Sequence, residues 1–185
     1  MKNKYTIKEL LDNVDINSIK EIYKEFKDYF TKDDIKYAID KKADLKNLYK
    51  YLEDKFDGEL IRYAIDKYAN LCILYEYLGY KFDKELIKYA IDNDEEYLYI
   101  LYGYIKDKFD RELIKYAIDK NADLKYLYFY LSNKFDKELI KYAISKKVDL
   151  EYLYHYLSDK FDNELKQLYE EKINEKWIYN KRIIR

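Results

Sequence analysis

The segment YAIDKNADLKYLYFYLSNKFDKELIK, at residues 116–141, decides the fold because the same pattern recurs along the chain. Equivalent segments cover 37–62, 63–88, 89–115 and 142–167, with a period of 26 residues and one extra residue in 89–115. Self-similarity at a fixed short period is the signature of repeat proteins, in which each unit packs on its neighbours. The sequence therefore predicts five repeats.

Each repeat contains two amphipathic helix patterns. In the quoted segment, Leu124, Leu127, Tyr128 and Leu131 follow the spacing i, i+3, i+4, i+7, which places them on one side of an α-helix, here named the B helix. The next helix, the A helix, begins after Asp136, whose carboxylate can accept hydrogen bonds from the backbone at a helix start. Helices this short are marginal alone, so each pair needs its neighbours.

These patterns predict an all-α fold: one right-handed α-solenoid domain over 1–185, built of two-helix repeats of about 26 residues. We expect residues 1–36 to form atypical N-terminal capping helices. Residues 168–185 should form a C-terminal capping helix that packs Ile173 and Trp177 on the last repeat. The units resemble those of helical-repeat solenoids in general, the class that includes tetratricopeptide and HEAT repeats. This resemblance is one of architecture and implies no residue roles.

Composition and charge argue against several classes of protein, namely nucleic-acid-binding, membrane and secreted proteins. The formal net charge of −1, from 36 basic and 37 acidic residues, provides no long-range attraction to nucleic acid or membranes. No apolar run approaches the roughly 20 residues that span a bilayer, and no secretory signal is readable. A single cysteine fits a reducing compartment, so we expect a cytoplasmic protein. Abundant Lys, Ile and Tyr are typical of an AT-rich genome, so codon bias supplies part of the 26 tyrosines.

The inventory of reactive side chains argues against an enzyme. His155 is the only histidine and Cys72 the only cysteine, which excludes the common catalytic triads and Cys/His zinc sites. Most carboxylates recur in register in every repeat, as expected for helix caps and not for an active site. We therefore expect no enzymatic activity, no cofactor and no bound metal.

The tyrosines fall into in-register series with different expected roles. On the apolar stripe of the B helices, we expect one series in the core: Tyr49, Tyr75, Tyr102, Tyr128 and Tyr154. A second series lies at the boundary of the A helices: Tyr37, Tyr63, Tyr89, Tyr116 and Tyr142.

The far side of the B helices is unusually apolar, which predicts a surface covered by a protein partner or by a second copy of the chain. The candidate partner-binding residues are Tyr51, Ile73, Tyr77, Ile100, Tyr104, Tyr126, Phe129, Tyr130, Tyr152 and Tyr156. The sequence therefore predicts a non-enzymatic scaffold or adaptor protein. Its small size suggests an inhibitor of a larger protein complex of a host or a mobile element. The alternative is a tightly wound superhelix that encloses these rings by its own curvature.

Nucleic acid is the rival ligand, because a lysine recurs one helical turn after the far-side tyrosines, and the C-terminal tail is basic. The candidate contacts are Lys55, Lys81, Lys108, Lys134, Lys160, Lys181 and Arg182. Recurring glutamates just beyond these lysines and the balanced net charge disfavour this alternative.

Overall fold

The computed structural model describes residues 6–14, 16–93 and 96–183, with side chains up to residue 175 apart from those of residues 16 and 17. Regular structure in these ranges is helical throughout, which confirms the all-α prediction. The α-helices are α1 (Ile7–Asn13), α2 (Ile16–Glu25), α3 (Lys32–Asp40), α4 (Leu45–Tyr51), α5 (Gly58–Asp66), α6 (Leu71–Leu78), α7 (Lys84–Asn93), α8 (Leu98–Ile105), α9 (Arg111–Asp119), α10 (Leu124–Tyr130), α11 (Lys137–Lys146), α12 (Leu150–Leu157) and α13 (Asn163–Ile183). Short 3-10 helices follow the B helices and α2: η1 (Lys27–Tyr29), η2 (Glu53–Lys55), η3 (Gly79–Lys81), η4 (Lys106–Lys108), η5 (Ser132–Lys134) and η6 (Ser158–Lys160).

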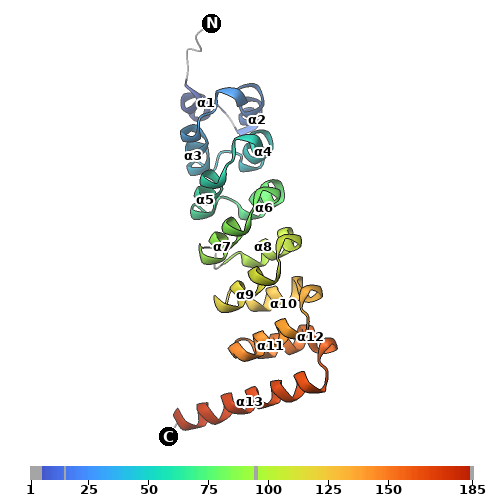
Figure 1. Ribbon diagram of the computed structural model, residues 1–185. Coiled ribbons are helices and arrows are strands. Elements are labelled where there is room, and N and C mark those ends of the chain that lie inside the picture. Colours follow the sequence, from blue (N-terminus) through green and yellow to red (C-terminus); the bar gives the residue numbers. More distant parts are fainter. Residues whose placement is uncertain (1–5, 15, 94–95, 184–185) are drawn as a thin grey trace. The chain divides into compact units, whose positions relative to one another are not determined.

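The chain divides into two compact units, unit one up to Ile105 and unit two from Lys106 onward. In unit one, α1, α3, α5 and α7 pack in sequence as one row, and α2, α4, α6 and α8 pack as a second row (Figure 1). In unit two, α9, α11 and α13 form one row, and α10 packs on α12. The helices pack as expected for a helical repeat within each unit. A single domain over the whole chain stays a prediction.

The A helices begin as the sequence predicts. Asp57, Asp110 and Asp136 each accept a hydrogen bond from the backbone N–H three residues later, through a side-chain oxygen at 2.9–3.1 Å. Thr31 caps α3 in the same way and forms a capping box with Asp34. These bonds satisfy donors that a helix start would otherwise leave unpaired.

The loops from A to B helices contain a conformation that the sequence did not predict. Lys42 and Asp44 both have positive φ, as do the equivalent Tyr68 and Asn70. In the first of these loops, the Ala43 N–H donates to the Ala38 carbonyl at 3.0 Å, and the Lys42 N–H donates to the Ile39 carbonyl at 2.9 Å. This is the hydrogen-bond pattern of a Schellman helix ending, here without glycine.

In the loops before α4, α6, α10 and α12, the second left-handed residue is the N-cap of the B helix. Asp44 and Asn70 accept backbone hydrogen bonds with their side chains, as predicted for N-caps. Asp123 and Asp149 occupy the same position but make no side-chain cap bond.

The core follows the predicted apolar stripes. The recurring small residue of the A helices is fully buried at Ala38, Ala64, Ala90, Ala117 and Ala143, so its lack of a longer side chain allows close helix packing. Four tyrosines of the B-helix series are buried as predicted, at Tyr49, Tyr75, Tyr102 and Tyr128.

Tyr154 departs from the core prediction, because its side chain is 38% exposed. After α12 the chain continues as the single long helix α13, which packs on α11. The Tyr154 ring instead stacks on Tyr169 of α13, with ring centroids 5.0 Å apart. The in-register position alone therefore does not ensure burial at the last repeat.

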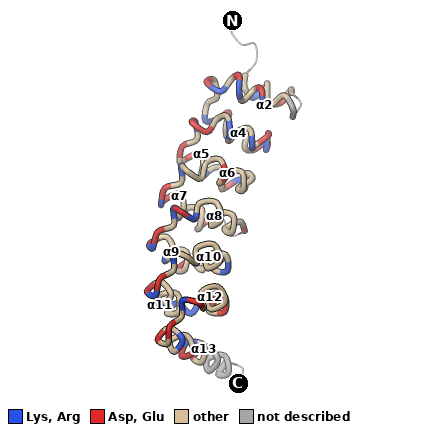
Figure 2. Tube along the Cα trace, turned by 90° about the vertical axis from the view of Figure 1, so that its right-hand side faces the viewer, with Lys and Arg blue, Asp and Glu red and all other residues tan. Residues whose placement is uncertain are grey.

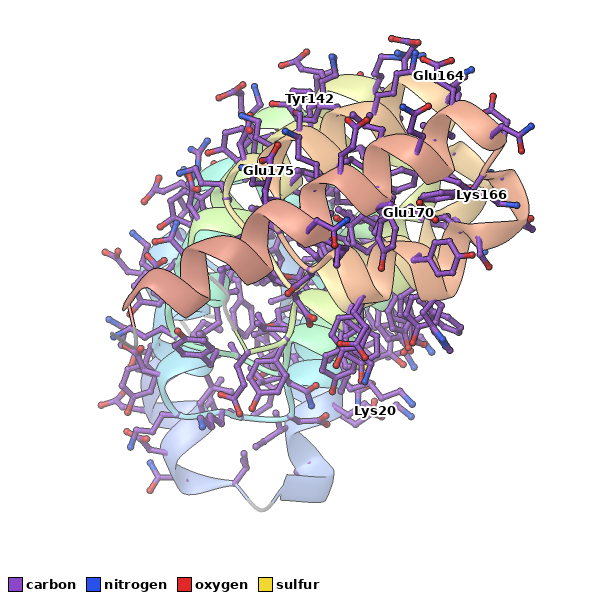
Figure 3. The ribbon with its side chains drawn as sticks, turned by 90° about the horizontal axis from the view of Figure 1, so that it is seen from below. Lys20, Tyr142, Glu164, Lys166, Glu170 and Glu175 are labelled. Atoms are coloured by element: carbon purple, nitrogen blue, oxygen red, sulfur yellow. The ribbon has the colours of Figure 1, made fainter. Side chains whose placement is uncertain are left out.

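The long C-terminal helix agrees with the sequence. Figure 3, viewed from below, shows α13 in front, with Glu164, Glu170 and Glu175 labelled along it. Ile173 is half-buried, whereas Trp177 lies among the side chains outside the described part. Among the described residues, no helix combines the length and apolar character that crossing a bilayer requires.

Candidate binding surface

Five aromatic side chains of α10 and α12 form a connected surface cluster, here named the aromatic platform. Its members are Tyr126, Phe129, Tyr130, Tyr152 and Tyr156. Tyr126 and Tyr130 stack along α10 with centroids 6.3 Å apart, and Tyr152 and Tyr156 stack along α12 with centroids 6.5 Å apart. Spacing of i, i+4 places each pair on the same side of its helix.

Two side chains connect the stacked pairs. The Phe129 ring contacts Tyr130 at 4.9 Å and Tyr156 at 5.6 Å between centroids, both edge to face. On the other side, the Lys125 Nζ lies 5.0 Å from the centroid of the Tyr126 ring and 5.8 Å from that of Tyr152. The platform is thus a closed ring of contacts, with a cation–π link at one edge.

The platform faces solvent. Phe129 is 51% exposed and Tyr152 is 40% exposed, while the other three rings are half-buried. The helices that carry it are poor in charge: Lys125 is the one charged residue of α10 and Glu151 the one of α12, apart from His155. Figure 2 shows α10 mostly in tan, whereas blue and red follow α9 and α11. Exposed aromatic surface with little charge is typical of the core of a protein interface.

The predicted residues of unit one differ in their exposure to solvent. Tyr51, Ile73, Tyr77 and Ile100 are half-buried, and Tyr104 is 48% exposed. The Tyr104 hydroxyl lies 3.4 Å from the Cys72 sulfur, and this hydrogen bond raises the pKa of the tyrosine.

Sequence reasoning missed several exposed tyrosines in unit one, namely Tyr29, Tyr68, Tyr80 and Tyr99. Tyr68 stands at a left-handed loop position where three other loops have Lys42, Asn121 and Lys147. Tyr80 stands in a 3-10 turn where the other repeats have aspartate or asparagine. Comparing the repeats at these variable positions, and not only within the helices, would have found both.

The A-helix tyrosines connect successive repeats. Four of the hydroxyls donate to an aspartate of the preceding repeat or, for Tyr37, of the N-terminal segment: Tyr37 to Asp12 at 2.6 Å, Tyr63 to Asp40 at 2.8 Å, Tyr89 to Asp66 at 2.6 Å and Tyr142 to Asp119 at 2.7 Å. The bond to Asp66 raises the pKa of the Tyr89 hydroxyl. These rings thus belong to the internal structure of each unit.

The A-helix edge also carries ion pairs between repeats. Lys32 lies 2.5 Å from Asp57 and 2.8 Å from Glu59, and Lys36 lies 2.6 Å from the same glutamate. Hydrogen bonds from Lys32 lower the pKa of both carboxyl groups. The acidic first turns of A helices thus serve as partners for lysines of the preceding repeat.

Most of the candidate nucleic-acid lysines bind backbone within their own unit. The Nζ atoms donate to carbonyl oxygens of the preceding repeat: Lys55 to Asp28 at 3.3 Å, Lys81 to Phe56 at 2.9 Å, Lys134 to Phe109 at 2.8 Å and Lys160 to Phe135 at 2.9 Å. Lys108 is exposed. Lys181 and Arg182 lie among the side chains outside the described part.

In the part of the chain that the structure describes, no cluster of three His, Cys, Asp or Glu residues could hold a metal ion. His155 is exposed, with its ring 4.6 Å from that of Tyr156. A shallow depression of about 490 Å³ lies between the loops around Asp44 and Asn70 and is lined mainly by polar side chains.

Comparisons with protein-family models, with curated proteins and with solved structures find no match to this chain.

Proposed function

We propose that this protein is a non-enzymatic α-solenoid that binds a protein partner through the far side of its B helices, with the aromatic platform as its main contact. The observation that carries the proposal is the solvent-facing cluster around Phe129 and Tyr152 on two charge-poor helices. Aromatic residues supply a large contact area with few rotatable bonds, which suits them to anchor an interface.

The solenoid architecture is supported by how the repeats connect within each unit. Helices of one kind pack in order along each row, and each connection repeats in register. Tyr63 bonds to Asp40 of the preceding repeat, and Lys81 bonds to the Phe56 carbonyl in the same direction. Nearest-neighbour ties of this kind are what a stack of repeats requires.

A protein partner is favoured over nucleic acid because of what the lysines contact. The ammonium groups of Lys134 and Lys160 each donate to two backbone carbonyls, which leaves at most one of their three N–H groups for a phosphate. The formal net charge of −1 adds no attraction to a polyanion. Nucleic acid binding stays the alternative function.

The proposal is tested by affinity capture from the native host, with the wild type compared with the triple variant Tyr126→Ser, Phe129→Ser and Tyr152→Ser. We expect the variant to keep its helical circular dichroism and to lose a partner that the wild type retains. Tyr29→Ser is the matched control, because this tyrosine is exposed but lies outside the platform. Identical captured proteins from the wild type and a folded triple variant would contradict the proposal.

Self-association is the other arm of the same test. Light scattering after size exclusion reports whether the wild type forms dimers that the triple variant does not form. A monomeric wild type with a captured partner supports a foreign ligand, and a platform-dependent dimer identifies a second copy as the partner.

A further inference from the structure

The size of the aromatic platform limits what can bind there. An aromatic side chain buries about 150–250 Å² when fully covered. With Phe129 about half exposed, Tyr152 at 40% and three rings half-buried, the platform offers on the order of 300 Å² of aromatic surface. A stable interface between folded proteins needs about 800 Å² from each partner. The platform alone therefore suits a short peptide segment and is too small to hold a dimer.

The chemistry of the platform selects among the ways in which proteins bind peptides. Addition of a strand needs a sheet edge, and the described residues form only helices. Recognition of phosphorylated or acidic peptides needs clustered arginines, whereas the two platform helices carry Lys125 and Glu151, whose charges cancel. Charge complementarity therefore favours an uncharged peptide.

Tyrosine surfaces match one uncharged conformation in particular, the polyproline II helix. Its pyrrolidine rings pack on aromatic faces, and its carbonyl groups make no internal hydrogen bonds. Tyrosine hydroxyls of the kind carried by Tyr130 and Tyr156 can donate to such carbonyls, and proline has no N–H that would need an acceptor.

The spacing of the platform agrees with this ligand. The stacked pair Tyr126 and Tyr130 belongs to α10, and the pair Tyr152 and Tyr156 to α12, which packs on α10. Packed helices lie about 8–10 Å apart. A polyproline II helix advances about 9.3 Å per turn of three residues. One turn of such a peptide thus advances by about the usual distance between two packed helices.

We infer that the aromatic platform binds an uncharged, proline-rich segment of the partner in the polyproline II conformation. The peptide runs across α10 and α12, with Phe129 between the two positions at which its rings pack. This inference rests on the proposed function, since it names the part of a protein partner that the platform contacts.

The test is fluorescence anisotropy of a labelled decaproline peptide titrated with the full chain. We expect saturable binding of decaproline and none of a Gly/Ser peptide of equal length. The double variant Phe129→Ser and Tyr152→Ser should weaken binding about tenfold or more, because it removes the two most exposed rings of the platform. Phe129→Tyr, which keeps an aromatic ring, and Tyr29→Ser, outside the platform, should bind like the wild type.

Two further probes separate the failure of this inference from that of the proposed function. If an amphipathic Leu/Lys helical peptide binds and the double variant abolishes its binding, while decaproline does not bind, the inference is wrong and the proposed function stands. If oligo(dT) alone binds and depends on the platform, both are wrong and nucleic acid is the ligand. If no probe binds and partner capture is also insensitive to the triple variant, both fail together.

Discussion

In unit two, aromatic side chains have different roles on the row of A helices, α9, α11 and α13, and on the B helices α10 and α12. On α11, the Tyr142 hydroxyl donates to Asp119 at 2.7 Å, and the Lys146 ammonium pairs with the same carboxylate at 2.5 Å. On α10 and α12, the rings of Phe129 and Tyr152 contact other aromatic side chains and remain largely exposed. The A-helix row uses its polar groups to join repeats, whereas the B-helix row retains surface beyond what stacking covers. An abundance of tyrosine therefore marks a candidate site only on the B-helix row.

The largest expected effect is a difference in stability between two variants of α10, one in its buried apolar stripe and one in the aromatic platform. Leu127 of α10 is fully buried, and Phe129, two residues later, is 51% exposed. Leu127→Ala should lower the free energy of unfolding by about 2–5 kcal/mol, because it removes buried methyl groups and leaves a cavity. Phe129→Ala should change it by less than about 1 kcal/mol.

Urea unfolding followed by circular dichroism measures both variants of α10. Equal losses of stability would contradict the distinction between stripe and platform, since they would mean that Phe129 packs like a core residue.

Two glycines of unit one lie at helix ends, and alanine substitutions at them are expected to change stability in opposite directions. A Cβ added to Gly79, in the 3-10 turn after the B helix α6, would lie 2.8 Å from the Ile105 Cγ2. Gly79→Ala should therefore destabilise by about 1–3 kcal/mol through overpacking. A Cβ at Gly58, which begins the A helix α5, would meet only the Leu86 Cδ2 at 3.9 Å. Gly58→Ala should stabilise by about 0.4–1 kcal/mol by restricting the unfolded chain.

Thermal unfolding shows whether these two alanine variants shift the midpoint in opposite directions. A shift of the same sign for both would mean that the tight contact at Gly79 relaxes at little cost.

Two buried tyrosines at the same repeat position form the third pair. The Tyr49 hydroxyl donates to the Ala69 carbonyl at 2.6 Å, whereas the buried Tyr128 hydroxyl has no hydrogen-bond partner among the described residues. Ala69 lies in the loop after α5, and the loop after α3 has Ala43 at the same position. The equivalent residue in the loop after α11 is Val148.

Tyr49→Phe should cost about 1 kcal/mol, because it leaves the Ala69 carbonyl unpaired. Tyr128→Phe should be neutral or stabilising, because it removes a hydroxyl that is buried without a bond. Parallel urea titrations of the two variants measure the difference, and a larger loss for Tyr128→Phe than for Tyr49→Phe would contradict this reading.

The repeat pattern allowed us to predict which side of each helix is buried. It did not allow us to predict contacts that depend on which segment lies next to a residue in the folded chain. The repeated Leu and Tyr spacing determines which side of a B helix is apolar, so burial of Tyr49 and Tyr102 could be predicted. Tyr154 shares that spacing but is 38% exposed and stacks on Tyr169 of α13, a neighbour that the repeat pattern does not predict.

The candidate lysines show the same limit. Lys134 was predicted as part of a nucleic-acid-binding ladder, and its Nζ donates to the backbone carbonyls of Asp107 and Phe109, which a residue pattern does not reveal. The left-handed residues Lys42 and Tyr68 were not predicted either, since residues other than glycine seldom adopt that conformation. The platform residues could be predicted because the apolar character of the far side of the B helices is visible in the residue pattern itself.

The smallest expected effect is the loss, at low pH, of the stability that the ion pairs of Glu175 contribute. Glu175 of α13 pairs with Lys147 at 2.6 Å and with Lys172 at 2.8 Å, and these hydrogen bonds lower its pKa to about 2. Because the folded pKa lies below the unfolded value of about 4.3, the pairing stabilises the fold at neutral pH and loses this contribution as the pH falls toward 2. Glu175→Gln should thus lower the thermal midpoint slightly at pH 7, since the group is exposed to solvent. The midpoints of the variant and the wild type should converge as the pH falls below about 2. A difference that does not shrink between pH 7 and pH 2 would mean that Glu175 stabilises α13 through its packing and not through its charge.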